Sequence, residues 1–124
     1  LNTRPWQHVI NPIYIIYQMI KKNNSKFIDE FNIGPKNCSY NVRYVLNALN
    51  KLNKNNKVRI KYKNLYNLKE SQFLRLNKSK SKKLFKYPKS NFKKDLLKTN
   101  EWYLNSFNNI NMTDFTLKQI YEYI

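Results

Sequence analysis

The stretch Arg4-Pro5-Trp6-Gln7-His8-Val9 places a cation, an indole, an amide and an imidazole directly before an apolar segment that runs to Met19. Pro12 stands near the start of this segment, where a missing backbone N–H is tolerated because the first helical N–H groups have no intrahelical partner. Beyond it, apolar residues recur at helical spacing. The pattern predicts a helix over residues 8–22 with one apolar face, which consists of Ile13, Ile16, Tyr17 and Ile20.

The composition indicates one folded domain with a strong positive charge. The 124 residues are 41% hydrophobic and 15% aromatic, which is too apolar for a disordered chain. The formal net charge is +17, but 20 of the 24 basic residues are Lys, and Asn occurs 21 times. Lys and Asn have AT-rich codons. Arg, whose planar guanidinium suits the reading of bases, is scarce. We therefore interpret most of the charge as solvated surface, with nucleic acid as the less favoured partner.

The counts of cysteine and histidine restrict the possible chemistry. Cys38 is the only cysteine, so no disulfide forms within the chain, which fits a reducing, cytoplasmic compartment. His8 is the only histidine, and one thiol with one imidazole makes no metal-ligand constellation. No apolar run approaches the roughly 20 residues of a membrane-spanning helix. We expect no metal and no membrane partner.

The rest of the pattern predicts an α+β fold with three to four helices and short strands. Besides residues 8–22, helices are expected from residue 41 or 42 to 52, over 90–106 and over 112–123, and a short basic helix over 79–84. Ser90 is a candidate N-cap for the helix over residues 90–106, and Thr113 or Asp114 for the helix over residues 112–123.

Short strands are expected over residues 31–35, 58–62 and 73–76, where apolar residues alternate with polar ones or precede turn residues. The first ends at Gly34, the only glycine of the chain. A single retained glycine indicates a backbone with φ > 0 or a close backbone approach.

Five sequence islands follow one another along the chain. They are Arg4-Pro5-Trp6-Gln7-His8-Val9; Phe31-Asn32-Ile33-Gly34-Pro35; Glu70 with Leu74-Arg75-Leu76-Asn77-x-Ser79-Lys80; Thr99-x-Glu101-Trp102-Tyr103; and Asn111-Met112 with Thr116-Leu117-x-Gln119-Ile120.

Taken together, the islands resemble the C-terminal portion of the sugar-nucleotide 4,6-dehydratases, within the extended short-chain dehydrogenase/reductase superfamily. The opening and the ending are most similar to the CDP-glucose 4,6-dehydratases, and the resemblance spans residues 4–123. It implies a small C-terminal substrate-binding lobe of an extended Rossmann-type (α/β) enzyme. Because the chain also opens without an initiator Met, we expect it to be the C-terminal part of a longer protein.

The resemblance implies that residues 1–124 hold the sugar nucleotide and that the Rossmann NAD-binding domain lies outside this chain. A single glycine cannot form a G-x-G-x-x-G turn. The family reaction moves hydride from sugar C4 to bound NAD, eliminates water across C5–C6 and returns hydride to C6. It would convert CDP-glucose to CDP-4-keto-6-deoxyglucose. We expect the longer protein to be a homodimeric lyase and this chain alone not to be catalytic.

The resemblance also implies a substrate site made of four residues. Arg4 matches the arginine that reaches the substrate diphosphate, because a guanidinium fork suits two phosphate oxygens. Glu70 matches a glutamate near the nucleotide ribose, whose hydroxyls can donate to a carboxylate. Gln7 and His8 either contact the substrate or link the lobe to the Rossmann half. No catalytic, cofactor-binding or metal-binding residue is expected in the chain.

Two other interpretations stay open. The first is a small basic nucleic-acid-binding module, for which residues 57–66 offer the best patch of cations and aromatics. The second is a truncated gene product that only folds or oligomerises. If the chain is instead a lobe, the surface that faces the missing domain should be exposed and partly apolar.

Overall fold

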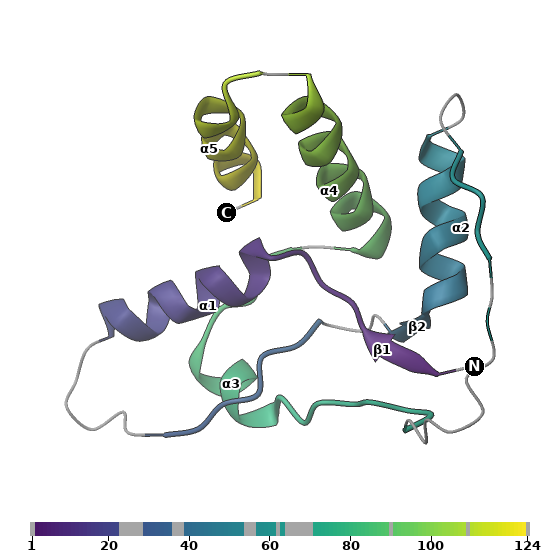
Figure 1. Cartoon of the computed structure of the whole chain (residues 1–124). Coiled ribbons are helices and arrows are strands. Elements are labelled where there is room, and N and C mark those ends of the chain that lie inside the picture. Colours follow the sequence, from purple (N-terminus) through teal and green to yellow (C-terminus); the bar gives the residue numbers. More distant parts are fainter. Residues whose placement is uncertain are drawn as a thin grey trace.

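The computed structural model describes residues 2–22, 29–35, 39–53, 57–61, 63, 71–89, 91–108 and 110–123. Within them the chain is a small mixed α+β domain with five helices and one two-stranded sheet (Figure 1). In chain order the elements are β1 (Thr3–Pro5), α1 (Ile10–Lys21), β2 (Ser39–Asn41), α2 (Val42–Leu52), α3 (Ser79–Leu84), α4 (Phe92–Phe107) and α5 (Met112–Tyr123). The predicted helix positions are confirmed to within two residues at each end, and with the short α3 the helices number five rather than three to four. None of these helices combines the length and the apolarity that crossing a membrane requires.

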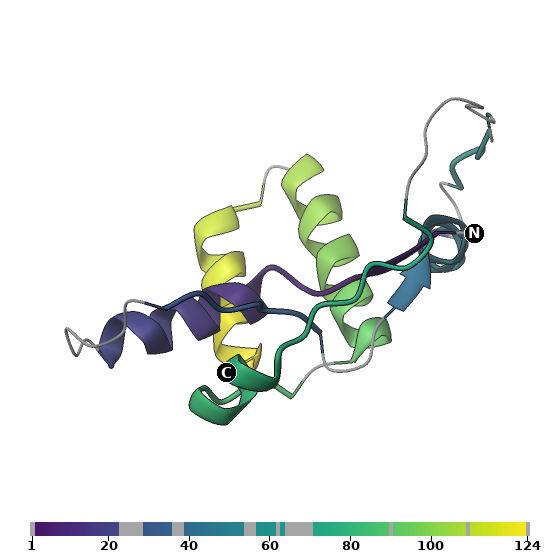
Figure 2. The same cartoon turned by 90° about the horizontal axis from the view of Figure 1, so that it is seen from below.

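Strand β1 has neighbours along both of its edges. On one edge it pairs antiparallel with β2, where Thr3 lies opposite Asn41. On the other edge Thr3 forms a parallel bridge with Phe73, and its N–H donates to the Gln72 carbonyl over 2.9 Å. Figures 1 and 2 both show the segment after residue 71 passing beside β1. Three-residue strands give almost no periodic signal, so neither β1 nor β2 was predicted.

Two of the three predicted strands are wrong where the structure describes them, because no neighbouring strand offers them a ladder, and the third is confirmed at one residue only. In residues 31–35, the Asn32 carbonyl instead accepts from the Ser81 hydroxyl at 2.7 Å. In residues 58–61, both backbone groups of Val58 bond to the Asn50 side chain. In residues 73–76 only Phe73 joins a bridge. Tyr62 lies outside the described residues.

Helices α1 and α3 enclose a small core. Ile15 and Ser81 are fully buried there. The Ser81 hydroxyl also shares a hydrogen bond of 2.7 Å with the Tyr87 hydroxyl. The Gln18 amide donates to the Lys86 carbonyl and accepts from the Lys86 N–H, at 2.8 and 2.9 Å. Side-chain bonds to backbone therefore fix α1 against the chain that leaves α3.

Helices α4 and α5 lie side by side, and the end of α5 returns to the start of α1 (Figure 1). Polar side chains connect the two helices along their length. These contacts are Tyr123 Oη to Asp95 Oδ1 at 2.8 Å, Lys98 Nζ to Glu122 Oε2 at 2.6 Å, Gln119 Nε2 to the Lys98 carbonyl at 2.9 Å, and Trp102 Nε1 to Thr116 Oγ1 at 2.9 Å.

Asparagine side chains cap three of the helices. Each accepts a backbone N–H from the first turn, which satisfies a donor that has no intrahelical partner. These caps, with donor–acceptor distances of 2.8, 2.9 and 3.1 Å, are Asn41, Asn91 and Asn111. The predicted caps are therefore wrong. Asn91 rather than Ser90, which lies outside the described residues, caps α4, and Thr113 and Asp114 lie inside α5.

Gly34 lies against the side chain of Leu76. A Cβ at residue 34 would lie 3.2 Å from Leu76 Cδ1, which is tighter than ordinary van der Waals contact, and the backbone there is not left-handed. Of the two alternatives raised by the single glycine, close approach is the one that the structure supports.

We expect Ile15→Ala to lower the free energy of unfolding by about 2–5 kcal/mol, because it leaves a cavity at a fully buried site. Ile13→Ala is the matched control, since it removes the same atoms from the same helix at a side chain that is 56% exposed. Urea denaturation followed by circular dichroism measures both changes. Equal losses for the two variants would contradict this location of the core.

Candidate functional site

Arg4 lies on β1, between β2 and the segment that begins at residue 71. Its Nη1 donates to the Thr3 carbonyl at 2.8 Å and to the Ser71 carbonyl at 3.1 Å. These bonds hold the guanidinium against the residue that follows Glu70 in the sequence. Glu70 itself lies outside the described residues.

Trp6 fixes the backbone just after Arg4. Its indole N–H donates to the Tyr40 carbonyl at 2.9 Å, and Tyr40 is the residue opposite Arg4 in the sheet. The bond crosses from the end of β1 to β2. It restrains the strand that carries the Arg4 side chain.

Gln7 points toward a different part of the molecule. Its Nε2 donates to the Ile33 carbonyl at 3.4 Å, and its Oε1 is buried without a hydrogen-bond partner among the described residues. Gln7 also lines a cavity of about 780 Å³ that lies between α2 and α4 and is bounded by the start of α1 and by α5.

The walls of this cavity are mostly apolar. Val45 and Leu49 come from α2, and Leu96 and Trp102 from α4. No Lys or Arg is among the described residues that line it. A diphosphate needs cations or backbone N–H donors to replace its hydration. The cavity is therefore unsuited to the diphosphate of a sugar nucleotide, and the environment of Arg4 is separate from it.

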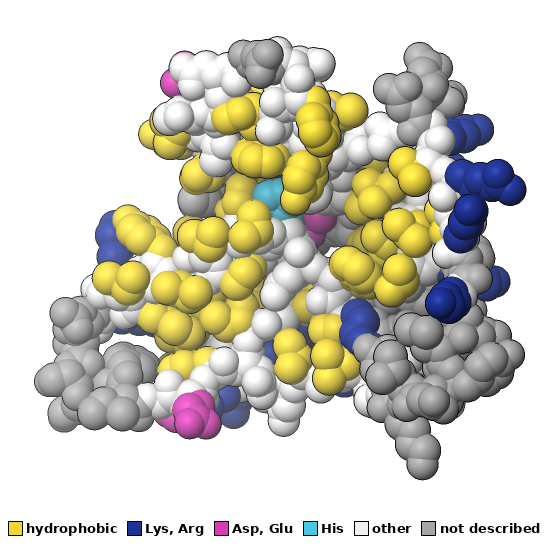
Figure 3. Space-filling model, viewed as in Figure 1, with side chains coloured by type: hydrophobic (Ala, Val, Ile, Leu, Met, Phe, Trp, Pro, Cys, Tyr) yellow, Lys and Arg dark blue, Asp and Glu magenta, His cyan; other side chains and the backbone are white. Residues whose placement is uncertain are grey.

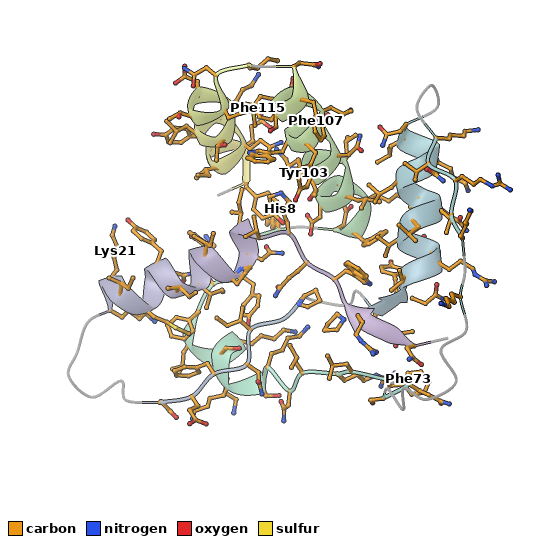
Figure 4. The ribbon with its side chains drawn as sticks, in the orientation of Figure 1. His8, Lys21, Phe73, Tyr103, Phe107 and Phe115 are labelled. Carbon is orange, nitrogen blue, oxygen red and sulfur yellow. The ribbon has the colours of Figure 1, made fainter. Side chains whose placement is uncertain are left out.

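His8 is a buried residue at the junction of α1, α4 and α5 (Figure 4). Its Nδ1 accepts the Ile10 N–H at 3.2 Å, and its ring stacks on Tyr123 with centroids 5.1 Å apart. Burial lowers the His8 pKa below its ordinary value of 6.5, with Asp95 opposing the shift and Lys98 adding to it. The neutral imidazole caps the start of α1 and packs on the last turn of α5.

The sequence did not predict the buried polar cluster around His8. Asp95, Lys98, Gln119 and Tyr123 are each less than 9% exposed. They connect α4, α5 and the start of α1 through the contacts given above. In α4 the positions i, i+3 and i+7 are occupied by Asp95, Lys98 and Trp102. This spacing could have placed the two charged residues on the same inner face as the tryptophan.

Of the four predicted substrate residues, Glu70 lies outside the described residues, and the other three do not gather at one place. Arg4 lies near the segment after Glu70, whereas Gln7 and His8 face the interior. Nor does any group of three or more His, Cys, Asp and Glu side chains within the described ranges have an arrangement that could hold a metal. Comparison of the chain with protein-family models, curated proteins and solved structures finds no match.

We expect the free energy of unfolding to fall as the pH decreases from 6.5 toward the lowered folded-state pKa of His8. In this interval the unfolded chain binds more protons than the folded one, so acid favours unfolding. His8→Asn keeps an acceptor for the Ile10 N–H and removes the titration. Denaturant melts across this interval should show the pH slope in the original chain and a weaker slope in the variant.

The control for this experiment lies at lower pH. Hydrogen bonds from Lys80 and Lys98 lower the pKa of Asp29 and Glu122, so these carboxylates lose their contribution only as the pH falls below their ordinary values of 3.8 and 4.5. Both forms of the protein should keep that acid sensitivity. An unchanged slope in His8→Asn near pH 6 would show that another group is responsible.

Proposed function

We propose that the chain is the substrate-binding lobe of a sugar-nucleotide 4,6-dehydratase that acts on CDP-glucose. The observation that carries this proposal is the ordered series of five islands over residues 4–123. The structure supports it at one point, because Arg4 contacts Ser71, directly after Glu70. A guanidinium at this edge of β1 would suit the diphosphate of a nucleotide.

In this proposal the lobe orients the substrate and does not react with it. Binding a remote nucleotide fixes the sugar relative to the reacting groups, which lowers the barrier by prior orientation. NAD would be bound by an upstream Rossmann domain, since the only glycine of this chain, Gly34, packs on Leu76 and forms no Gly-rich turn.

The exposed apolar face of α1 supports a domain contact. Ile13, Ile16, Tyr17 and Ile20 are between 46% and 68% exposed. Figure 3 shows hydrophobic side chains gathered over α1 on the viewed face. Such a contiguous patch is unusual on an isolated soluble domain and typical of an interface. We propose that the NAD-binding domain of the same longer protein covers this α1 face.

Arg4→Ala should lower the rate of 4-keto product formation from CDP-glucose in the longer polypeptide with its upstream sequence. Loss of a charge-assisted hydrogen bond costs about 1.5–3 kcal/mol, which corresponds to about 10- to 150-fold in kcat/KM. Arg59→Ala, which removes an exposed guanidinium elsewhere, is the matched control. A wild-type polypeptide without product, or equal rates for both variants, would overturn the assignment.

Replacing Ile16 and Ile20 by Gln should reduce binding of an apolar dye to the 124-residue chain and leave its melting temperature nearly unchanged. Both side chains are exposed, so their loss removes surface rather than core packing. Phe107→Gln with Tyr121→Gln removes two exposed side chains outside the α1 face and serves as the control. In the longer polypeptide, only the Ile16/Ile20 variant should weaken domain association. Full retention of association would contradict the α1 interface.

A further inference from the structure

Four exposed cations occupy every second position of the segment beside α2. They are Lys57, Arg59, Lys61 and Lys63, here called the basic ridge. The Cα atoms of consecutive members lie at most about 7 Å apart, since two residues of extended chain cannot span more. Figure 3 shows Lys and Arg side chains along the edge of the molecule formed by α2 and this segment. The ridge is thus a row of positive charge and not a scattered surface.

The ridge segment is fixed to α2 by one side chain. Asn50 accepts the Val58 N–H at 3.0 Å and donates to the Val58 carbonyl at 2.9 Å. Both backbone groups of one residue are thereby satisfied without a neighbouring strand. Ile60 lines the cavity beneath, together with Val58. The amide clamp and the apolar contact hold the backbone between the first three cations in place.

Positive charge is not balanced by acids in this part of the chain, as is also the case between Glu70 and Asp95. No Asp or Glu occurs between Glu30 and Glu70, and nine Lys or Arg residues do. The four ridge side chains form no ion pair with any residue that the structure describes. Uncompensated cations in a row are suited to a polyanion.

We infer that the basic ridge binds the phosphate backbone of single-stranded nucleic acid without sequence preference. A single row of charges matches one phosphate chain. Lys supplies point charges rather than base-reading forks, so contacts to phosphate are favoured over contacts to bases. An anionic membrane is the less suitable partner, because a basic patch alone is only weakly attracted to anionic lipids and stable attachment takes an apolar contact as well. Val58 is the one large apolar side chain exposed in the described part of the ridge segment. This inference is independent of the proposed sugar-nucleotide role.

The test compares two variants of the 124-residue chain with equal net charge. The ridge variant carries Lys57→Gln, Arg59→Gln, Lys61→Gln and Lys63→Gln. The control carries Lys82→Gln, Lys83→Gln, Lys86→Gln and Lys89→Gln, which removes four exposed charges on and after α3. Fluorescence anisotropy measures binding of a labelled single-stranded oligonucleotide of mixed sequence between about 50 and 200 mM salt.

We expect the ridge variant to bind at least about tenfold more weakly than the control at the lower salt concentration. The slope of log K against log salt should become shallower by about 2.8, the value for four phosphate contacts on a single strand. The paired variants Lys57→Gln/Arg59→Gln and Lys61→Gln/Lys63→Gln should each give about half of this change. They keep the test informative if the fourfold variant does not fold, which circular dichroism checks.

Three results would overturn the inference. The first is equal weakening by the ridge and control variants, which would show attraction by net charge alone. The second is unchanged oligonucleotide binding by the ridge variants. The third is binding to phosphatidylserine vesicles, lost in the ridge variant, with no oligonucleotide binding by the original chain, which would identify a membrane surface as the partner.

Discussion

Hydrogen bonds from both edges of β1 connect segments that are far apart in the sequence. Thr3 pairs with Asn41 on one side and bridges to Phe73 on the other. The chain then passes directly into Trp6, Gln7 and His8, which contact β2, the segment at residue 33 and α5 in turn. The described structure has no large sheet and only six buried hydrophobic residues, and this short path joins β2, the segment at residue 33 and α5.

The helices could be predicted because each has periodic apolar residues and a polar boundary, as α1 and α2 illustrate. The strands could not. β1 and β2 are three residues long, and whether Val58 joins a ladder depends on which segment lies beside it. The N-caps were predicted wrongly for a related reason. Ser, Thr, Asp and Asn are all good N-caps, and only the backbone geometry selects Asn111 over Thr113.

The candidate site was predictable only in part. A resemblance can single out Arg4, but it cannot show that Nη1 of its guanidinium bonds to the Ser71 carbonyl. His8 and Gln7 stand next to each other in one motif, yet both side chains face the interior. The single histidine gave no sign of its stacking on Tyr123, because that contact joins residues 115 positions apart. Long-range packing of this kind leaves no local pattern.

Tyr123 makes two contacts with one side chain. Its ring stacks on His8, and its hydroxyl donates to Asp95. The closing turn of α5 therefore acts as a latch between the first helix and the fourth. Proteolytic trimming of that turn would release both contacts at once and open the interior beside the cavity.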